Sequence, residues 1–184
     1  MRLLHPFEPR PELGGIELKG EASWRGGVLQ VRFVLRSPGN SLSWPALALP
    51  PARRDGLWQS TCLEAFIAAE GEASYWEVNL APNGNWNVYA LSGYRENLQP
   101  VGEITSLPYS LRRSEGIVEL QFQLDLNRWI PADQRVEVSL TAVVEDRQQG
   151  LSYWAWKHSG DEPDFHLRGS FQPLHPEGSE SGGA

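Results

Sequence analysis

The feature that most limits how this chain can fold is an alternation of apolar and polar residues with a period of two. In residues 118–126 every even-numbered residue is apolar and every odd-numbered one is polar. This pattern is typical of a β-strand that buries one face. Comparable segments occur at residues 16–24, 28–36, 62–68, 75–80, 86–91, 136–144 and 151–158, and weaker ones at 101–105 and 165–171.

Short connections rich in glycine and asparagine, such as residues 25–27 (RGG) and 83–84 (NG), separate several of these segments. Strands at a spacing of about ten residues, with no convincing helix and no repeat, predict an all-β fold. We expect an antiparallel β-sandwich of the jelly-roll or immunoglobulin-like kind, with about nine strands. This domain would cover residues 16–172, after an irregular lead-in (1–15) and before a disordered tail (173–184).

The segments 62–68, 75–80 and 86–91 can be paired as two hairpins, and only one register keeps the apolar residues together. In that register one face is apolar throughout, with the pairs Leu63–Leu80, Ala65–Val78, Ile67–Trp76, Leu80–Trp86, Val78–Val88 and Trp76–Ala90. A slip by one residue would mix apolar and polar side chains on both faces. We therefore expect Trp76 and Trp86 to lie in the core.

The opposite face of these hairpins carries acids, amides and a ring, namely Glu64, Glu77, Asn79, Asn87 and Tyr89. Glu64 and Glu77 lie on neighbouring strands and repel each other, so something must compensate their charges. Sugar hydroxyls or a cation could do so in a binding site. Alternatively, Arg95, Lys157 or another basic side chain could pair with them in a purely structural network.

Composition limits the kinds of partner. The formal net charge is −7, and no basic run is longer than the pairs Arg53-Arg54 and Arg112-Arg113. We therefore expect neither nucleic acid nor a membrane as a partner, and we interpret these arginine pairs as solvated. Cys62 is the only cysteine, which excludes an internal disulfide and a cysteine-based zinc site. The first residues lack the apolar run of a secretory signal, so we expect a cytoplasmic protein.

Three stretches resemble a known family: DGLWQSTCLE (residues 55–64), YWEVNLAPNGNWNVY (75–89) and GYR (93–95), with KH (157–158) and PDFH (163–166) further on. They are similar to the DOMON-like domains, relatives of the family-9 carbohydrate-binding modules. The resemblance covers about residues 16–172. It implies an antiparallel β-sandwich that binds a small ligand, typically a sugar or haem.

Residue by residue, the resemblance places Glu64, Glu77 and Asn79 on the ligand face. Trp58, Tyr94 and Arg95 are carried over with them, and Trp156 is a further aromatic candidate. Family-9 modules are usually secreted and joined to a glycanase, whereas this chain stands alone. That difference favours a soluble mono- or oligosaccharide over a polysaccharide.

Other functions were weighed against sugar binding. A glycoside hydrolase also uses two carboxylates, about 5–5.5 Å or 6.5–9.5 Å apart, but a flat sheet face excludes water poorly. Haem binding through a Met–His pair is excluded because the only methionine is Met1, which leaves His158 and His166 as ligands. Asp161, Glu162 and Asp164 could supply oxygen ligands for calcium, but their loop lacks the sequence pattern of a calcium-binding loop.

We therefore predict a protein that binds a small ligand, most plausibly a carbohydrate, without catalysing a reaction and without a cofactor or metal. The mechanism would combine ring stacking by Tyr89 or a nearby tryptophan with hydrogen bonds from the polar face. The first alternative is a structural β-sandwich module that binds a protein partner. A carboxylate-pair glycoside hydrolase and a haem binder rank below it.

Overall fold

The computed structural model describes residues 1–37 and 41–175, and in this part of the chain the protein is all-β. Its helices are three 3₁₀ turns, η1 (Pro11–Leu13), η2 (Leu57–Gln59) and η3 (Arg168–Ser170). Within the described residues, no helix has the length and apolar composition that a membrane crossing requires.

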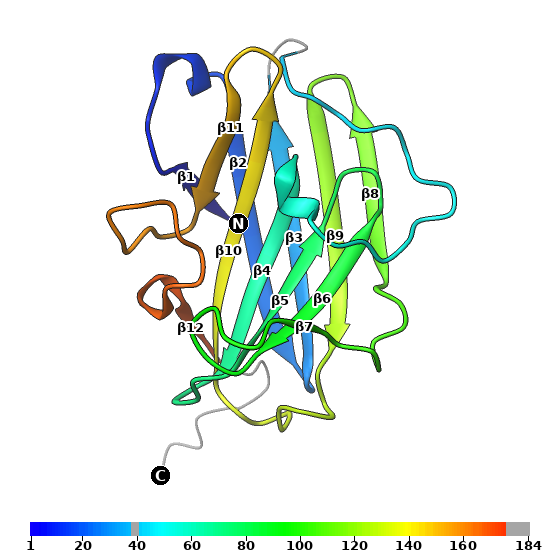
Figure 1. Ribbon diagram of the computed structural model, residues 1–184, viewed down its shortest axis with the longest axis vertical. Helices are drawn as coiled ribbons and strands as arrows, with labels where there is room; N and C mark the ends of the chain where they lie inside the picture. The colour runs from blue at the N-terminus through cyan, green and yellow to red at the C-terminus, as the bar shows by residue number, and fades with distance from the viewer. Residues whose placement is uncertain (38–40, 176–184) are drawn as a thin grey trace.

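The described residues form twelve strands rather than about nine (Figure 1). They are β1 (Arg2–Pro6), β2 (Glu17–Arg25), β3 (Val28–Arg36), β4 (Cys62–Ala69), β5 (Tyr75–Leu80), β6 (Trp86–Leu91), β7 (Gln99–Pro100), β8 (Tyr109–Ser114), β9 (Ile117–Asp125), β10 (Val136–Asp146), β11 (Gly150–Ala155) and β12 (Gln172–Leu174). Of the strands missed by the sequence analysis, β1, β7 and β12 have two to five residues, too few for alternation to show. The fourth, β8 (YSLRRS), ends in three polar residues that break the alternation.

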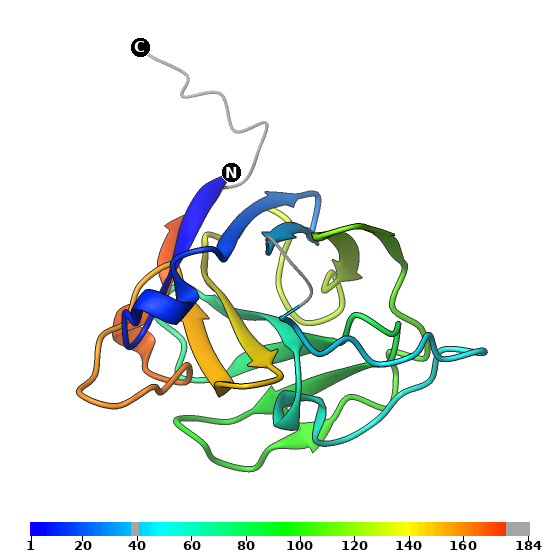
Figure 2. The ribbon, with the colours of Figure 1, turned by 90° about the horizontal axis from the view of Figure 1, so that it is seen from above.

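The strands form one antiparallel sheet that curls on itself, in the order β7-β6-β5-β4-β10-β11-β1-β2-β3-β9-β8, with β12 paired to β10. The antiparallel β-sandwich is as expected in its layers, but its two halves belong to one continuous sheet. Strand β1 pairs with β2 on one side and with β11 on the other, so it joins the two halves. Figure 2 shows the halves facing each other across the interior.

Three predictions about individual segments are wrong. Residues 1–15 are not an irregular lead-in, because they contain β1 and η1. Residues 101–105 form no strand, since β7 ends at Pro100. The expected strand at 165–171 is replaced by η3, and the last strand, β12, lies just after it and includes the first residues of the predicted tail. The rest of that tail, residues 176–184, lies outside the described residues.

The predicted register is confirmed. Strands β4, β5 and β6 pair residue for residue as expected, with Glu64 opposite Asn79 and Glu77 opposite Tyr89. The apolar faces of both halves meet in one core that includes Trp24, Phe33, Leu63 and Val88, with Trp86 in it and Trp76 packed against it. In β11, Trp154 belongs to this core.

A second, smaller apolar cluster lies on the outer face of the half that contains β4. We call it the outer cluster; it consists of Phe66, Ala68, Tyr75, Tyr89, Leu91, Val143, Ala155, Phe165 and Phe171. Phe165 and Phe171 come from the segment after β11, which folds back over the sheet. The outer face of this half is therefore partly covered, and the candidate site lies between the sheet and its cover.

The glycine in the β5–β6 turn gives a test of this packing. Gly84 has φ +93°, and a Cβ atom there would lie 2.3 Å from the hydroxyl oxygen of Tyr109. Gly71, in the β4–β5 turn, has a similar φ of +85° but nothing within 4 Å of its Cβ position. Both Gly→Ala variants should lose about 1–3 kcal/mol to backbone strain. We expect Gly84→Ala to lose at least about 1 kcal/mol more, because Tyr109 must also move.

Urea unfolding of the two variants beside the wild type measures this difference. Equal losses at the two glycines would show that the contact between the β5–β6 turn and Tyr109 is not formed in solution.

Candidate functional site

A pocket of about 330 Å³ opens on the outer face of β4, β5 and β10. The sheet supplies its floor, and three segments distant in sequence supply its walls. The lining residues are Trp58, Glu64, Phe66, Glu77, Leu91, Arg95, Leu98, Val143, Tyr153, Pro163, Phe165 and His166. Glu64 and Glu77, which alternation placed on the polar face, therefore meet at one pocket, as do Trp58 and Arg95.

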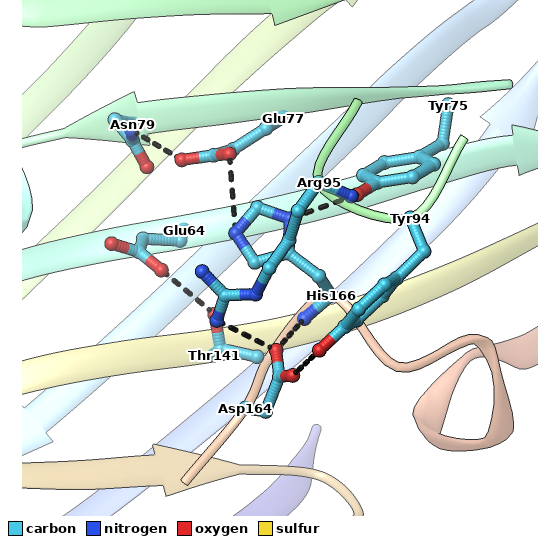
Figure 3. Close-up of polar contacts among 9 residues, drawn as sticks. All are labelled: Glu64, Tyr75, Glu77, Asn79, Tyr94, Arg95, Thr141, Asp164 and His166. Atoms are coloured by element: carbon cyan, nitrogen blue, oxygen red, sulfur yellow. Dashed lines mark hydrogen bonds and ion pairs between the residues drawn. The ribbon is translucent and has the colours of Figure 1, made fainter. Parts of the chain in front are cut away.

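The two carboxyl groups are buried and only partly satisfied. Glu64 is 2% exposed and Glu77 is 4% exposed. Thr141 Oγ1 donates to Glu64 Oε2 over 3.2 Å, and Asn79 Nδ2 donates to Glu77 Oε1 over 2.7 Å (Figure 3). Glu64 Oε1, Glu77 Oε2 and Asn79 Oδ1 are also buried and have no hydrogen-bond partner in the protein. Buried acceptors without partners are costly, so a ligand or water that donates hydrogen bonds would be stabilised here.

Burial changes the protonation of these acids. It raises the pKa of Glu64 well above the ordinary value, and the neighbouring charge of Glu77 raises it further. The pKa of Glu77 is also raised by burial, although the hydrogen bond from Asn79 and the charge of Arg95 oppose the shift. Both carboxyl groups therefore keep their protons to a higher pH than an exposed glutamic acid does.

A chain of hydrogen bonds orients the imidazole of His166 toward Glu77. The Arg95 backbone N–H donates to the Tyr75 hydroxyl over 3.3 Å, and that hydroxyl lies 2.9 Å from His166 Nδ1. The arrangement that satisfies all three groups has Tyr75 donating to Nδ1, which leaves the proton of the imidazole on Nε2. Nε2 lies 3.9 Å from Glu77 Oε2, which is too far for a direct hydrogen bond.

His166 is neutral at physiological pH. Burial, assisted by the charge of Arg95, lowers its pKa to about 4. The contact between His166 and Glu77 is therefore not an ion pair at neutral pH, and His166 does not compensate the buried acids.

Asp164 fixes the rim of the pocket. It accepts from Arg95 Nη2 over 2.9 Å, from the Tyr94 hydroxyl over 2.6 Å and from the His166 backbone N–H over 2.9 Å (Figure 3). These contacts join the turn after β6 to the loop after β11. Tyr94 and Arg95, two of the candidates from the sequence, thus lie together at the rim, and the charge of Arg95 is already paired.

Asn87 and Tyr89 are on the predicted face but do not line the pocket. Tyr89 is 1% exposed, so it cannot stack on a ligand. Its hydroxyl and Asn87 Nδ2 both donate to Asp55 Oδ1, each over 2.8 Å. Arg53, interpreted from the sequence as solvated, donates to Asn87 Oδ1 over 2.7 Å. These residues hold the loop that carries Trp58, whose ring meets that of Tyr89 edge-on at 6.0 Å.

Trp156 lies away from the pocket. It packs against the inner core, and the guanidinium of Arg2 lies 4.8 Å from its ring centroid. It lines a different hollow, beside Met1 and Gly20. Strand β11 ends at Ala155, so Trp156 lies just outside the strand.

The sequence analysis missed several residues that complete the pocket. His166 and Asp164 had been noted only as a possible haem ligand and a possible calcium ligand. Phe165 and Tyr153 were not singled out, because alternation cannot show which loop folds back onto a sheet. The motif PDFH at 163–166 was the one signal that could have found three of these four residues. The described residues contain no group of three or more His, Cys, Asp or Glu side chains arranged to hold a metal ion.

A larger hollow, of about 590 Å³, lies over the outer face of β2, β3, β8 and β9. Its polar lining includes Gln30, Gln121 and Gln123. None of the buried polar side-chain atoms without a partner, among the described residues, belongs to a residue that lines it. The smaller pocket over Glu64 and Glu77 is therefore the better candidate site.

No protein-family model and no curated protein sequence matches the chain. Solved structures share its fold. A "putative carbohydrate-binding protein" from Bacteroides uniformis has a TM-score of 0.73 and 12% identity, over 96% of this chain and 85% of that one. A family-9 carbohydrate-binding module from Caldicellulosiruptor kristjanssonii in complex with cellotriose has a TM-score of 0.60 and 9% identity, over 100% and 85%. A structure from the same organism with glucose has a TM-score of 0.54 and 11% identity, over 97% and 86%.

At these identities the similarity shows the fold alone. The chain has the all-β fold of these three structures.

The raised pKa values predict how stability depends on pH. A carboxyl group whose pKa is higher in the folded than in the unfolded state binds more protons when folded, so the free energy of unfolding falls as pH rises above about 4.5. Glu64→Gln should remove this penalty. At pH 7.5, without ligand, we expect it to melt higher than the wild type by about 2–4 °C or more. The difference should shrink toward pH 4.5.

Melting curves at both pH values, with Glu115→Gln as the control, test this prediction. Glu115 is an exposed carboxylate in the β8–β9 turn, so its removal changes the net charge equally. A Glu64→Gln variant that is less stable than the wild type at pH 7.5 would contradict the unpaired state of the Glu64 carboxyl group.

Proposed function

We propose that this protein is a non-catalytic binding protein for a small carbohydrate, held in the pocket over Glu64 and Glu77. The observation that carries the proposal is the pair of buried acceptor oxygens without partners, on Glu64 and Glu77, at a pocket with aromatic walls. Sugar hydroxyls can donate to such acceptors, and the apolar faces of a sugar ring can pack on aromatic rings.

The size of the pocket supports a small ligand. Its volume of about 330 Å³ lies at the lower end of the range for small-molecule sites. Trp58 is the exposed ring of the wall, at 38%, and is therefore the best placed to stack on a ligand. Two fold neighbours are complexes with cellotriose and with glucose, which agrees with this ligand class. The closer assignment to the DOMON-like domains is part of the same proposal.

The state of the two acids supports binding rather than hydrolysis. A glycoside hydrolase needs one carboxylic acid and one ionised carboxylate, so its site drives two pKa values apart. Here burial raises both pKa values. Among the described residues, no basic side chain forms an ion pair with Glu64 or Glu77 at neutral pH.

Calorimetric titration with glucose, cellobiose and cellotriose, followed by a wider glycan array, tests the proposal. We expect Glu77→Gln and Trp58→Ala each to weaken binding by about tenfold or more, through loss of a charge-assisted hydrogen bond and of the stacking ring. Trp156→Ala is the matched control, since that ring lies away from the pocket, and it should bind as the wild type does. Failure of every sugar to bind would refute the proposal.

A further inference from the structure

We propose that the pocket selects a sugar that carries a primary ammonium group, so that an amino sugar binds more tightly than its neutral parent. This inference rests on the proposed function and concerns the same site. It starts from the charges at the pocket rather than from its shape.

The charges that line the pocket do not balance once both acids are ionised. Among the described residues that line it, Arg95 is the only Arg or Lys side chain, and its guanidinium is paired with Asp164. His166 is neutral at physiological pH. Glu64 and Glu77 are thus left without a cation of the protein, although each is more than nine-tenths buried. A cation on the ligand would pair with these carboxylates and so offset the cost of burying their charges.

The free atoms match the donors of an ammonium group. Glu64 Oε1 and Glu77 Oε2 are buried acceptors without partners, on two residues that line the pocket (Figure 3). A primary ammonium group has three N–H donors and no acceptor. A hydroxyl group has one donor and can satisfy only one of these oxygens. The aromatic rings of Phe66, Tyr153 and Phe165 also line the pocket and attract a cation through their faces.

Binding of an ammonium group should be coupled to release of protons. Other titratable or charged groups lie near the acids, namely Cys62, Tyr75, Tyr89, Arg95 and His166. Behind them, Asp55 accepts from Tyr89 and Asp164 accepts from Arg95. The pKa values of the Cys62 thiol and of the Tyr75 and Tyr89 hydroxyls are raised, so these groups stay neutral near pH 7. Glu64 and Glu77 are therefore the groups that would lose protons when the cation enters.

The experiment compares glucosamine, galactosamine and mannosamine with glucose, galactose and mannose, by titration calorimetry of the full chain. At pH 6.5, where an amine with a pKa like that of an α-amino group is almost wholly protonated, we expect at least one amino sugar to bind about tenfold or more tightly than its neutral parent. The heat measured at this pH in buffers of different ionisation enthalpy should show proton release for the amino sugar only. Between pH 5.0 and 6.5 the preference for the amine should grow.

Variants distinguish a specific effect of Glu64 and Glu77 from a general effect of the protein's net charge. Glu64→Gln and Glu77→Gln should each abolish the preference for the amine, whereas Glu115→Gln, which removes the same charge in the β8–β9 turn, should keep it. Melting curves show whether each variant is folded, and proton release by the wild type gives a readout that needs no variant.

Two results would overturn the inference, and they differ in what they say of the proposed function. Equal or weaker binding of all three amino sugars, beside measurable binding of a neutral parent, overturns the inference and leaves carbohydrate binding in place. No binding of any of the six sugars, together with a blank glycan array, overturns both.

Discussion

The antiparallel register of β4, β5 and β6 is the constraint on which the rest of the structure depends. It places most of the large apolar side chains of these strands on one face, where the other half of the sheet covers them, while Phe66 and Leu91 belong to the outer cluster. The same register gathers Glu64, Glu77 and Asn79 on the opposite face. Because the side-chain period of a strand is two, core and site cannot be shifted independently of each other.

The short strand β1 also contributes to the curl of the sheet. By pairing with both β2 and β11 it makes one continuous sheet out of two halves that sequence alone presents as separate layers. The outer face over β4 and β10 then receives a cover of its own, built from the outer cluster and the loop after β11. That cover turns a flat polar face into a pocket from which water is partly excluded.

Much of this could be predicted from the sequence, and the limits are physical. Alternation identified the long strands, the register and the sharing of faces between Glu64, Glu77 and Asn79. It failed for β1, β7, β8 and β12, which are too short or too irregular to show a period. It also assigned Asn87 and Tyr89 to the ligand, because a period of two gives the face of a residue but not what covers that face. Both residues donate hydrogen bonds to Asp55, and no pattern in the sequence predicts that contact.

The origin of the pocket walls has a consequence for the dynamics of the chain. Trp58, Arg95 and His166 come from three loops that are far apart in sequence and meet only over the floor of the pocket. Asp164 already joins two of these loops, whereas the loop of Trp58 is held to the sheet through Asp55. A ligand that contacts all three would act as a cross-link between distant parts of the chain. Opening of the Trp58 loop would then be coupled to opening of the two loops that Asp164 joins.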